Sequence, residues 1–437
     1  MLKISKLSLA ILLGTTSSLA SAAQNDDIQT QLQQLKQQMQ QLQLKLEETE
    51  NKAQQQAQQQ KKLDAQVARQ QQQVEEKIIA DEAETKKSSG IKVGGAVRTN
   101  YSYTTYDEGN KDRNGDFDFD IFRLNFSGEV GDVILNAEIR FFDYMTAVKY
   151  AYAAYDFADD WQVQAGITKV PFGNWPYNSH NYFFSTNYYI GLEDDHDLGV
   201  LFKRKIADNW QLDVGFFKND ERGGSGSSDR YSYDVVGFRT ADEGIYDSPS
   251  TNEISEYNTF SARYGYHFEH KNGGTTEIGV SALTGGLHDD NDRVGDYNAW
   301  AVHLNSTIGQ WNFQLQHGEY EYNVDDMNRM VVGAYAYYDT IASDATMSNA
   351  NIAYSVPVEW GPVTGLQFYN DYGIIYDKSD NSADTWMNVT GVSVAAGGLF
   401  TYFDYVIGKN QPFIGGSVAG DSDETERRFN INIGYYF

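Results

Sequence analysis

The stretch Ala151–Gly173, AYAAYDFADDWQVQAGITKVPFG, decides the fold of this chain. It contains a strand, a short turn at Ala158–Asp160, a second strand and the beginning of a loop. Apolar side chains occupy every other position of the second strand: Trp161, Val163, Ala165 and Ile167. Because successive strand side chains point to opposite faces, this strand has one apolar face and one polar face.

The same unit recurs to the end of the chain, and no helical pattern remains that could cover the apolar faces. Lipid outside and water inside account for such strands, so the sequence predicts a transmembrane β-barrel. The mean hydropathy of −0.56 excludes a helical membrane protein but suits a barrel with polar loops and a polar lumen. The chain has no cysteine, which excludes disulfides and zinc–thiolate sites, and its net charge of −27 argues against nucleic acid as a partner.

Counting alternating runs gives about 17 strands, whereas a single-chain bacterial barrel needs an even number. The ambiguity lies in 329–358, where Met330–Tyr338 and Asn349–Val356 run in the same direction. We therefore expect 16 antiparallel strands, with 18 as the alternative. Turns at one end are short and the other ends carry long acidic or glycine-rich loops, which is typical of periplasmic and extracellular ends.

Two segments precede the barrel expected at 90–437. Residues 1–23 combine Lys3 and Lys6 with an apolar run and the ending Ala20–Ala23, the pattern of a secretory signal peptide. Residues 24–89 are rich in Gln, Lys, Glu and Ala and carry an apolar heptad seam, strongest from Ile28 to Leu46. We expect a periplasmic coiled coil that associates with copies of itself; a disordered Gln-rich tract is the alternative.

The chain ends in RRFNINIGYYF, with aromatic and apolar side chains on one face up to Phe437. This ending resembles that of outer-membrane barrels, in which the terminal aromatic strand is the signal for the barrel-insertion machinery. The resemblance implies that role for Phe437. The alternative is an ordinary buried final strand.

Two segments, RLNFSGEVGDVILNAEIRF (123–141) and VKYAYAAYDFADDWQVQAGITKVPFGN (148–174), are similar to the phosphate-selective porin O/P family of Gram-negative outer membranes. A coiled coil before the barrel resembles a subgroup associated with uptake of small dicarboxylates. The resemblance implies a 16-stranded homotrimer, embedded in lipid and lipopolysaccharide, whose third extracellular loop folds inward. Here that loop is Pro171–Asp197.

The loop carries many aromatic side chains, which would be unusually apolar in water. They are Trp175, Tyr177, Tyr182, Phe183, Phe184, Tyr188 and Tyr189. We expect them to fold against the lumen wall and constrict the pore. Packing between barrels of a trimer, or on lipid headgroups, is the alternative.

Strand parity places a row of arginines in the lumen, with lysines flanking the constricting loop. The predicted pore-lining residues are Arg98, Arg123, Glu138, Arg140, Lys169 and Lys203. Guanidinium groups in a narrow pore would attract carboxylates or phosphates, although they could instead pair with inward acids such as Glu138 and Glu129 to hold the wall.

These features favour a passive outer-membrane diffusion channel for small hydrophilic solutes that prefers small anions such as dicarboxylates and phosphate. A structural tether and a non-selective or cation-preferring porin are the alternatives, because from Gly90 onward 50 Asp and Glu oppose 23 Lys and Arg. We expect no enzyme, because no Ser, His and carboxylate fall in matching strand parity. The histidines lack metal-site spacing, and we expect no metal or cofactor.

Overall fold

The computed structural model describes residues 90–206, 209–224, 226–236, 254–271, 273–289 and 291–437. The signal peptide and coiled coil expected at 1–89 lie outside the described residues. The barrel strands are β1 (Gly90–Thr104), β2 (Asp116–Val130), β3 (Val133–Phe141), β4 (Thr146–Ala158), β5 (Trp161–Lys169), β6 (His196–Ile206), β7 (Trp210–Asp220), β9 (Ser255–Glu269), β10 (Thr275–His288), β11 (Arg293–Ile308), β12 (Trp311–Val324), β15 (Asp344–Trp360), β16 (Val363–Tyr376), β17 (Thr385–Ala396), β18 (Leu399–Lys409) and β19 (Glu426–Tyr436). The remaining elements are α3 (Glu108–Asp112), η1 (Thr186–Ile190), β8 (Asp234–Val235), β13 (Arg329–Ala334) and β14 (Tyr337–Ala342).

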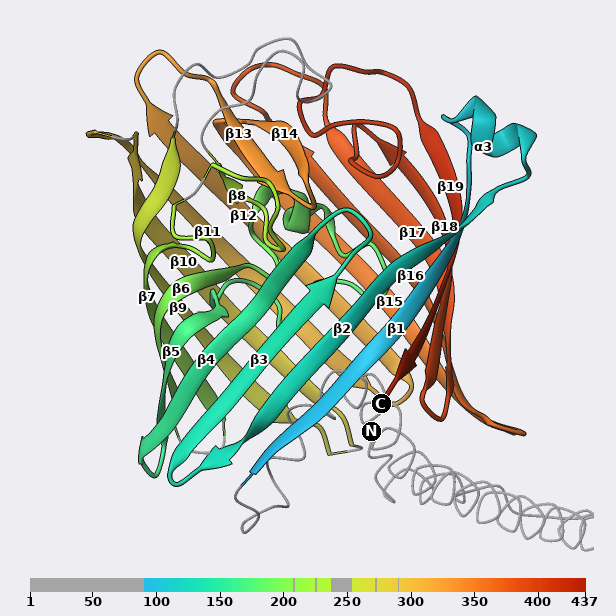
Figure 1. Ribbon diagram of the computed structural model, residues 1–437, viewed down its shortest axis with the longest axis horizontal. Helices are drawn as coiled ribbons and strands as arrows, with labels where there is room; N and C mark the ends of the chain where they lie inside the picture. Colours follow the sequence, from blue (N-terminus) through green and yellow to red (C-terminus); the bar gives the residue numbers. More distant parts are fainter. Residues whose placement is uncertain (1–89, 207–208, 225, 237–253, 272, 290) are drawn as a thin grey trace, which may run out of the picture. The chain divides into compact units, whose positions relative to one another are not determined.

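The described strands confirm a closed antiparallel barrel of 16 strands (Figure 1). Each strand pairs with its neighbours in the barrel, and β1 pairs with both β2 and β19. At this seam the last residue exchanges two main-chain hydrogen bonds with Gly95: Gly95 N donates to Phe437 O at 2.9 Å and Phe437 N donates to Gly95 O at 3.0 Å. Ring closure leaves no open sheet edge along the barrel.

Strand alternation determines which side chains face outward. Along β12, Phe313 and Leu315 are exposed, whereas Gln314, Gln316 and Tyr320 are buried. The same pattern on β11 exposes Trp300 and Val302. The exposed face is therefore apolar over the first part of β12 and the facing part of β11, as a lipid-facing surface requires, whereas His317, Glu319 and Glu321 are exposed farther along β12.

Aromatic side chains gather where strands begin after short turns. Trp161 and Trp311 each start a strand directly after such a turn, and Trp210 is the first residue of β7. Trp210 stacks on Tyr264 at a centroid distance of 4.7 Å, and Trp311 lies 4.6 Å from Tyr354. Amphipathic rings at this level are typical of the boundary between hydrocarbon and headgroups.

The surplus run among the 17 predicted strands is Met330–Tyr338, which is not a barrel strand. Met330–Tyr338 is divided between β13 and β14, which form a hairpin and pair with β8 in a separate three-stranded sheet. We call β8, β13 and β14 the inner sheet. Tyr335 and Ala336 turn this hairpin with φ angles of 53° and 56°. In the barrel, β12 pairs directly with β15, and the hairpin between them in the sequence adds no barrel strand. The number of barrel strands is therefore even.

No helix in the described part of the chain is long and apolar enough to cross a membrane.

Candidate functional site: the inserted loop and the basic wall

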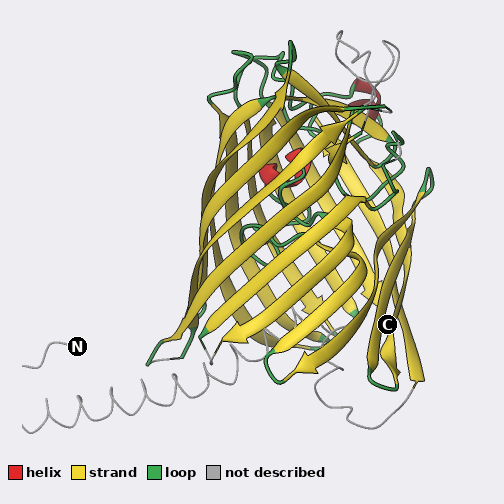
Figure 2. Cartoon of the chain, turned by 90° about the vertical axis from the view of Figure 1, so that its left-hand side faces the viewer, coloured by secondary structure: helices red, strands yellow, loops and turns green. Residues whose placement is uncertain are grey.

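The connection between β5 and β6, residues 170–195, lies inside the barrel, and we call it the inserted loop. Figure 2 shows its short helix η1 within the ring of strands. A hydrogen bond from Val170 N to Asp195 O, 2.9 Å long, joins the two ends of the loop. We call this junction the neck of the loop, and the residues between Val170 and Asp195 extend from it into the lumen.

The first part of the inserted loop is bonded to the wall on β9, β10 and β12. Ser261 Oγ donates to Pro171 O at 2.9 Å, and Arg263 Nε donates to Gly173 O at 2.7 Å. Gly173 N in turn donates to Ser281 Oγ on β10 at 2.9 Å. Asn174 N donates to a β12 side chain, Gln316 Oε1, at 2.8 Å. These bonds fix the path of the loop through its main chain.

The tip of the loop reaches β12 and β16. Asp371 accepts hydrogen bonds from His180 N at 2.7 Å and Asn181 Nδ2 at 2.8 Å, and its other oxygen lies 2.7 Å from His180 Nδ1. The second ring nitrogen of His180 lies 2.7 Å from Asn312 Oδ1 on β12. Burial opposes the charged imidazole, but Asp371 outweighs it and raises the pKa of His180 above its usual value. The loop is therefore anchored to the wall through a charge-assisted contact.

A buried carboxylate holds the loop on itself. Glu193 accepts hydrogen bonds from Asn178 N at 2.8 Å and from Ser185 N at 3.0 Å, and Ser185 Oγ also donates to it. Burial raises the pKa of Glu193 to about 6, although these donors counteract the rise. Glu193 therefore links the outgoing and returning halves of the loop.

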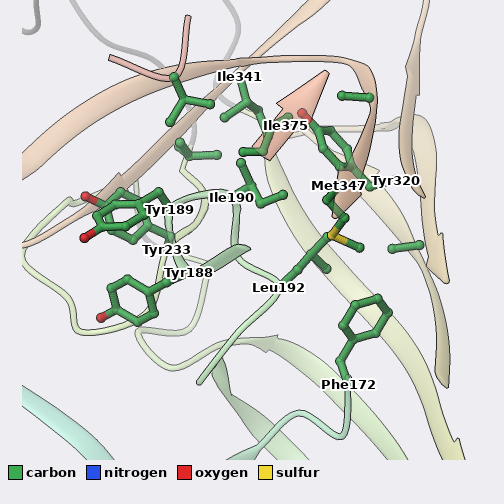
Figure 3. Packing of buried hydrophobic residues seen from close by; sticks show 14 of the residues in the cluster. Phe172, Tyr188, Tyr189, Ile190, Leu192, Tyr233, Tyr320, Ile341, Met347 and Ile375 are labelled. Atoms are coloured by element: carbon green, nitrogen blue, oxygen red, sulfur yellow. The ribbon is translucent and has the colours of Figure 1, made fainter. Parts of the chain in front are cut away.

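Two of the predicted loop aromatics, Tyr188 and Tyr189, pack beside the inner sheet and the segment before β8. Tyr188 Oη donates to Tyr231 O at 3.0 Å and lies 2.5 Å from Tyr335 Oη. Figure 3 shows Tyr188 and Tyr189 beside Tyr233, with Ile190 and Leu192 on the side of the β15 residue Met347. The loop and the inner sheet thus share one apolar cluster within the lumen.

The predicted arginines on β2 and β3 share one acid. Glu138 accepts from Arg140 Nε at 2.6 Å and lies 3.6 Å from Arg123 Nη1, and all three side chains are buried. Asn125 Nδ2 donates to the same carboxylate at 2.6 Å. On β1, Arg98 pairs with Asp120 at 2.8 Å.

A second acid, Asp194 of the inserted loop, is held between two lysines. Lys169 Nζ lies 2.7 Å and Lys149 Nζ 2.9 Å from its oxygens, and Tyr231 Oη donates to it at 2.6 Å. Burial disfavours the carboxylate, but the two ammonium groups overcome this and hold the pKa of Asp194 well below its usual range.

The bases of this wall also lie over aromatic rings, most of which belong to the inserted loop or to the segment before β8. The contacts, from base to ring centroid, are Arg98 to Tyr182 (5.4 Å), Arg123 to Tyr436 (5.1 Å), Arg140 to Tyr231 (4.5 Å), Lys149 to Tyr231 (5.0 Å) and Tyr177 (5.6 Å), Lys169 to Tyr177 (4.9 Å) and Trp175 (5.9 Å), Lys203 to Trp175 (5.4 Å), and Arg263 to Trp175 (5.2 Å). We call this series the basic–aromatic ladder. It brings every predicted pore-lining base together with an aromatic ring, and Phe183 lies outside it against Arg428.

Two ladder bases were not among the predicted residues. Lys149 is the extra residue of a β-bulge, because Glu138 pairs with Tyr150 and Ile139 with Val148. A bulge turns two consecutive side chains toward one face, so simple alternation cannot reveal it. Arg263 on β9 does follow the alternation, since Ser261 and Arg263 are buried while Ala262 and Tyr264 are exposed. The sequence signal that could have identified Arg263 is its place at an inward-facing position of an alternating strand.

Comparison with known proteins adds evidence on the fold. No protein-family model and no curated protein matches the chain. Among solved structures, it is similar to an anion-selective porin from Comamonas acidovorans, with a TM-score of 0.51 and 11% identity over 80% of this chain and 100% of the other. It is also similar to the outer-membrane channel DcaP of Acinetobacter baumannii, with a TM-score of 0.50 and 14% identity over 81% and 99% of the two chains. At these identities the likeness shows a shared barrel fold.

Replacing Asp371 by alanine should release the tip of the inserted loop, because the carboxylate accepts from three donors there. We expect hydrogen exchange of the amides around His180 to accelerate roughly ten-fold or more, since a hydrogen bond to a charged group contributes about 1.5–3 kcal/mol. Exchange mass spectrometry on detergent-purified protein measures this. The control is Asp384→Ala, an exposed position; equal exchange in both variants would contradict the anchor.

Proposed function

We propose that this protein is a passive diffusion channel of a bacterial outer membrane, narrowed by its inserted loop. The observation that carries the proposal is the attachment of that loop to the wall on β9–β12 and β16, beside the basic–aromatic ladder. The apolar exterior and the aromatic residues at strand starts support a membrane location. Both similar solved structures carry names of membrane pores, one a porin and the other an outer-membrane channel.

We further propose a modest preference for small anions, with carboxylates ahead of phosphate. Ion pairs along β1–β5 join five bases, namely Arg98, Arg123, Arg140, Lys149 and Lys169, to three acids, namely Asp120, Glu138 and Asp194. Charge in a narrow zone with low-dielectric walls acts more strongly than charge in open loops, where a Debye length of about 8 Å screens it. One similar structure is named as an anion-selective porin. The described residues place no dense lysine cluster at the pore, so high phosphate affinity does not follow.

Among the ion-paired bases of β1–β5, Arg98 and Lys169 are the best placed to meet a solute. Their side chains keep 14% and 19% exposure, whereas those of Arg123 and Arg140 keep 2% and 5%. Arg123 and Arg140 also neutralise the buried Glu138, and removing them would leave that charge uncompensated. We therefore assign anion attraction to Arg98 and Lys169 and a structural role to the other two arginines.

A cation-preferring general porin is the competing proposal, and the net charge of −27 favours it. The acids behind that charge decide permeation only if they line the narrow zone. The two proposals predict opposite signs for the zero-current potential across a salt gradient.

The selectivity test is the zero-current potential in planar bilayers across a tenfold KCl gradient. We expect an anion-selective wild type, and Arg98→Gln combined with Lys169→Gln should lower the anion-to-cation permeability ratio about two-fold or more, equivalent to roughly 0.4 kcal/mol. The matched control is Arg293→Gln with Lys271→Gln, both exposed. A cation-selective wild type, or a double variant that behaves like the control, would refute the assignment.

We also propose that the aromatic ring of Phe437 is the signal for membrane insertion. Phe437→Ala keeps both main-chain bonds to Gly95, whereas deletion of Phe437 removes them. In cells both variants should accumulate in the periplasm, but purified Phe437→Ala should refold in detergent like the wild type. Heat-modifiable Phe437→Ala barrel at normal levels in the outer membrane would show that only the seam matters.

Finally, we propose that the mature protein is a homotrimer, because the heptad seam of 28–46 and the family resemblance both favour self-association. Native mass spectrometry of detergent-purified protein should show mainly trimer, and a variant lacking residues 24–89 should remain trimeric. A mainly monomeric or dimeric full-length protein would contradict the proposal.

A further inference from the structure

Three carboxylates from separate segments meet at the neck of the inserted loop. Asp195 ends the loop, Asp197 lies on β6 in the barrel wall and Asp234 lies on β8 of the inner sheet. One oxygen from each side chain lies within 4.8 Å of the others. Asp197 and Asp234 are only 3% exposed. Bulk water therefore cannot screen the repulsion among these groups.

More acids surround this cluster. Among the described residues, the guanidinium of Arg230 forms ion pairs with three acids of this region. Arg230 Nη1 lies 2.9 Å from Asp220, 3.0 Å from Asp234 and 3.7 Å from Glu221. Among the described contacts, no basic side chain forms an ion pair with Asp195 or Asp197.

A polar side chain outside the acid cluster also lacks a partner beside it. The Oγ1 of Thr168 on β5 is buried with no hydrogen-bond partner among the described residues, and so is Asp197 Oδ1. Thr168 has no exposed surface, and it is the direct cross-strand neighbour of Asp197. Directly opposed residues project from the same face of a sheet. The hydroxyl therefore lies beside the carboxylates, and burial without a partner is costly for both groups.

We propose that Asp195, Asp197 and Asp234, with the hydroxyl of Thr168, form a calcium-binding site. Ca²⁺ accepts six to eight oxygen ligands, including carboxylates, in flexible geometry, and water can complete the shell. Two positive charges would offset the carboxylate repulsion and use the oxygens that lack partners. Mg²⁺ fits less well, because it demands near-ideal octahedral geometry and gives up its water reluctantly.

The position of this site gives the ion a structural effect. Its three acidic ligands come from the inserted loop, the barrel wall and the inner sheet. A bound ion would therefore tie the inner sheet to the point where the inserted loop joins the wall. This inference does not depend on conduction, because binding and stability are measurable without a channel assay.

Terbium luminescence tests the site directly, because Tb³⁺ replaces Ca²⁺ and is sensitised by nearby tyrosines such as Tyr233, the neighbour of Asp234. Detergent-purified full-length protein, stripped with EDTA and dialysed, should give saturable Tb³⁺ emission that Ca²⁺ displaces. Asp197→Asn combined with Asp234→Asn should weaken this binding at least about ten-fold, since ligand charge sets Ca²⁺ affinity. The control is Asp325→Asn with Asp326→Asn, an exposed acidic pair.

Thermal unfolding supplies the second readout. Ca²⁺ should raise the unfolding temperature of the wild type and of the control above that in EDTA, but not that of the Asp197/Asp234 variant. In EDTA this variant should be at least as stable as the wild type, because it has lost like-charge repulsion. If it does not fold, Asp195→Asn, at a partly exposed position, serves in its place. An unshifted wild type, or a site variant that responds like the wild type, would overturn the proposal.

Discussion

The structure depends on one constraint: in hydrocarbon, each main-chain N–H and C=O must find its partner within the protein. Sixteen strands meet this demand by closing on themselves, and the two bonds between Gly95 and Phe437 belong to the final seam. Strand alternation, interrupted at bulges such as the one at Lys149, turns the apolar face outward and the polar face toward the lumen. The remaining architecture follows from how that polar interior is filled.

The interior is filled by connections rather than by strands. The inserted loop and the inner sheet bring tyrosines against the wall, and the inward bases lie over these rings. Most of these bases therefore have two kinds of partner, a carboxylate such as Glu138 or Asp194 and an aromatic face. This arrangement pairs the charges in a crowded space and leaves partial exposure at Arg98 and Lys169.

Much of the barrel was predictable, because alternation and short turns are local signals. The errors have the same origin, because a local signal does not show which distant strand a segment pairs with. Met330–Tyr338 alternates like a barrel strand, yet it pairs with β8, and only the three-dimensional path separates the two cases. Lys149 was missed because a bulge shifts the parity within one strand. The proximity of Asp195 and Asp197 to Asp234 could not be predicted from the sequence. Asp234 lies on β8, in a long connection whose path is not set by any local sequence pattern.

The attachment of the inserted loop has a mechanical consequence. A ring of sixteen strands is wide enough to be flattened by lateral pressure from the bilayer, because hydrogen bonds resist stretching along the wall far better than bending of the wall. The loop leaves β5 and is bonded to β9, β12 and β16, so it braces the ring from within. Shortening this loop would remove these braces and make the cylinder easier to deform. The same loop therefore fills the interior and stiffens the wall.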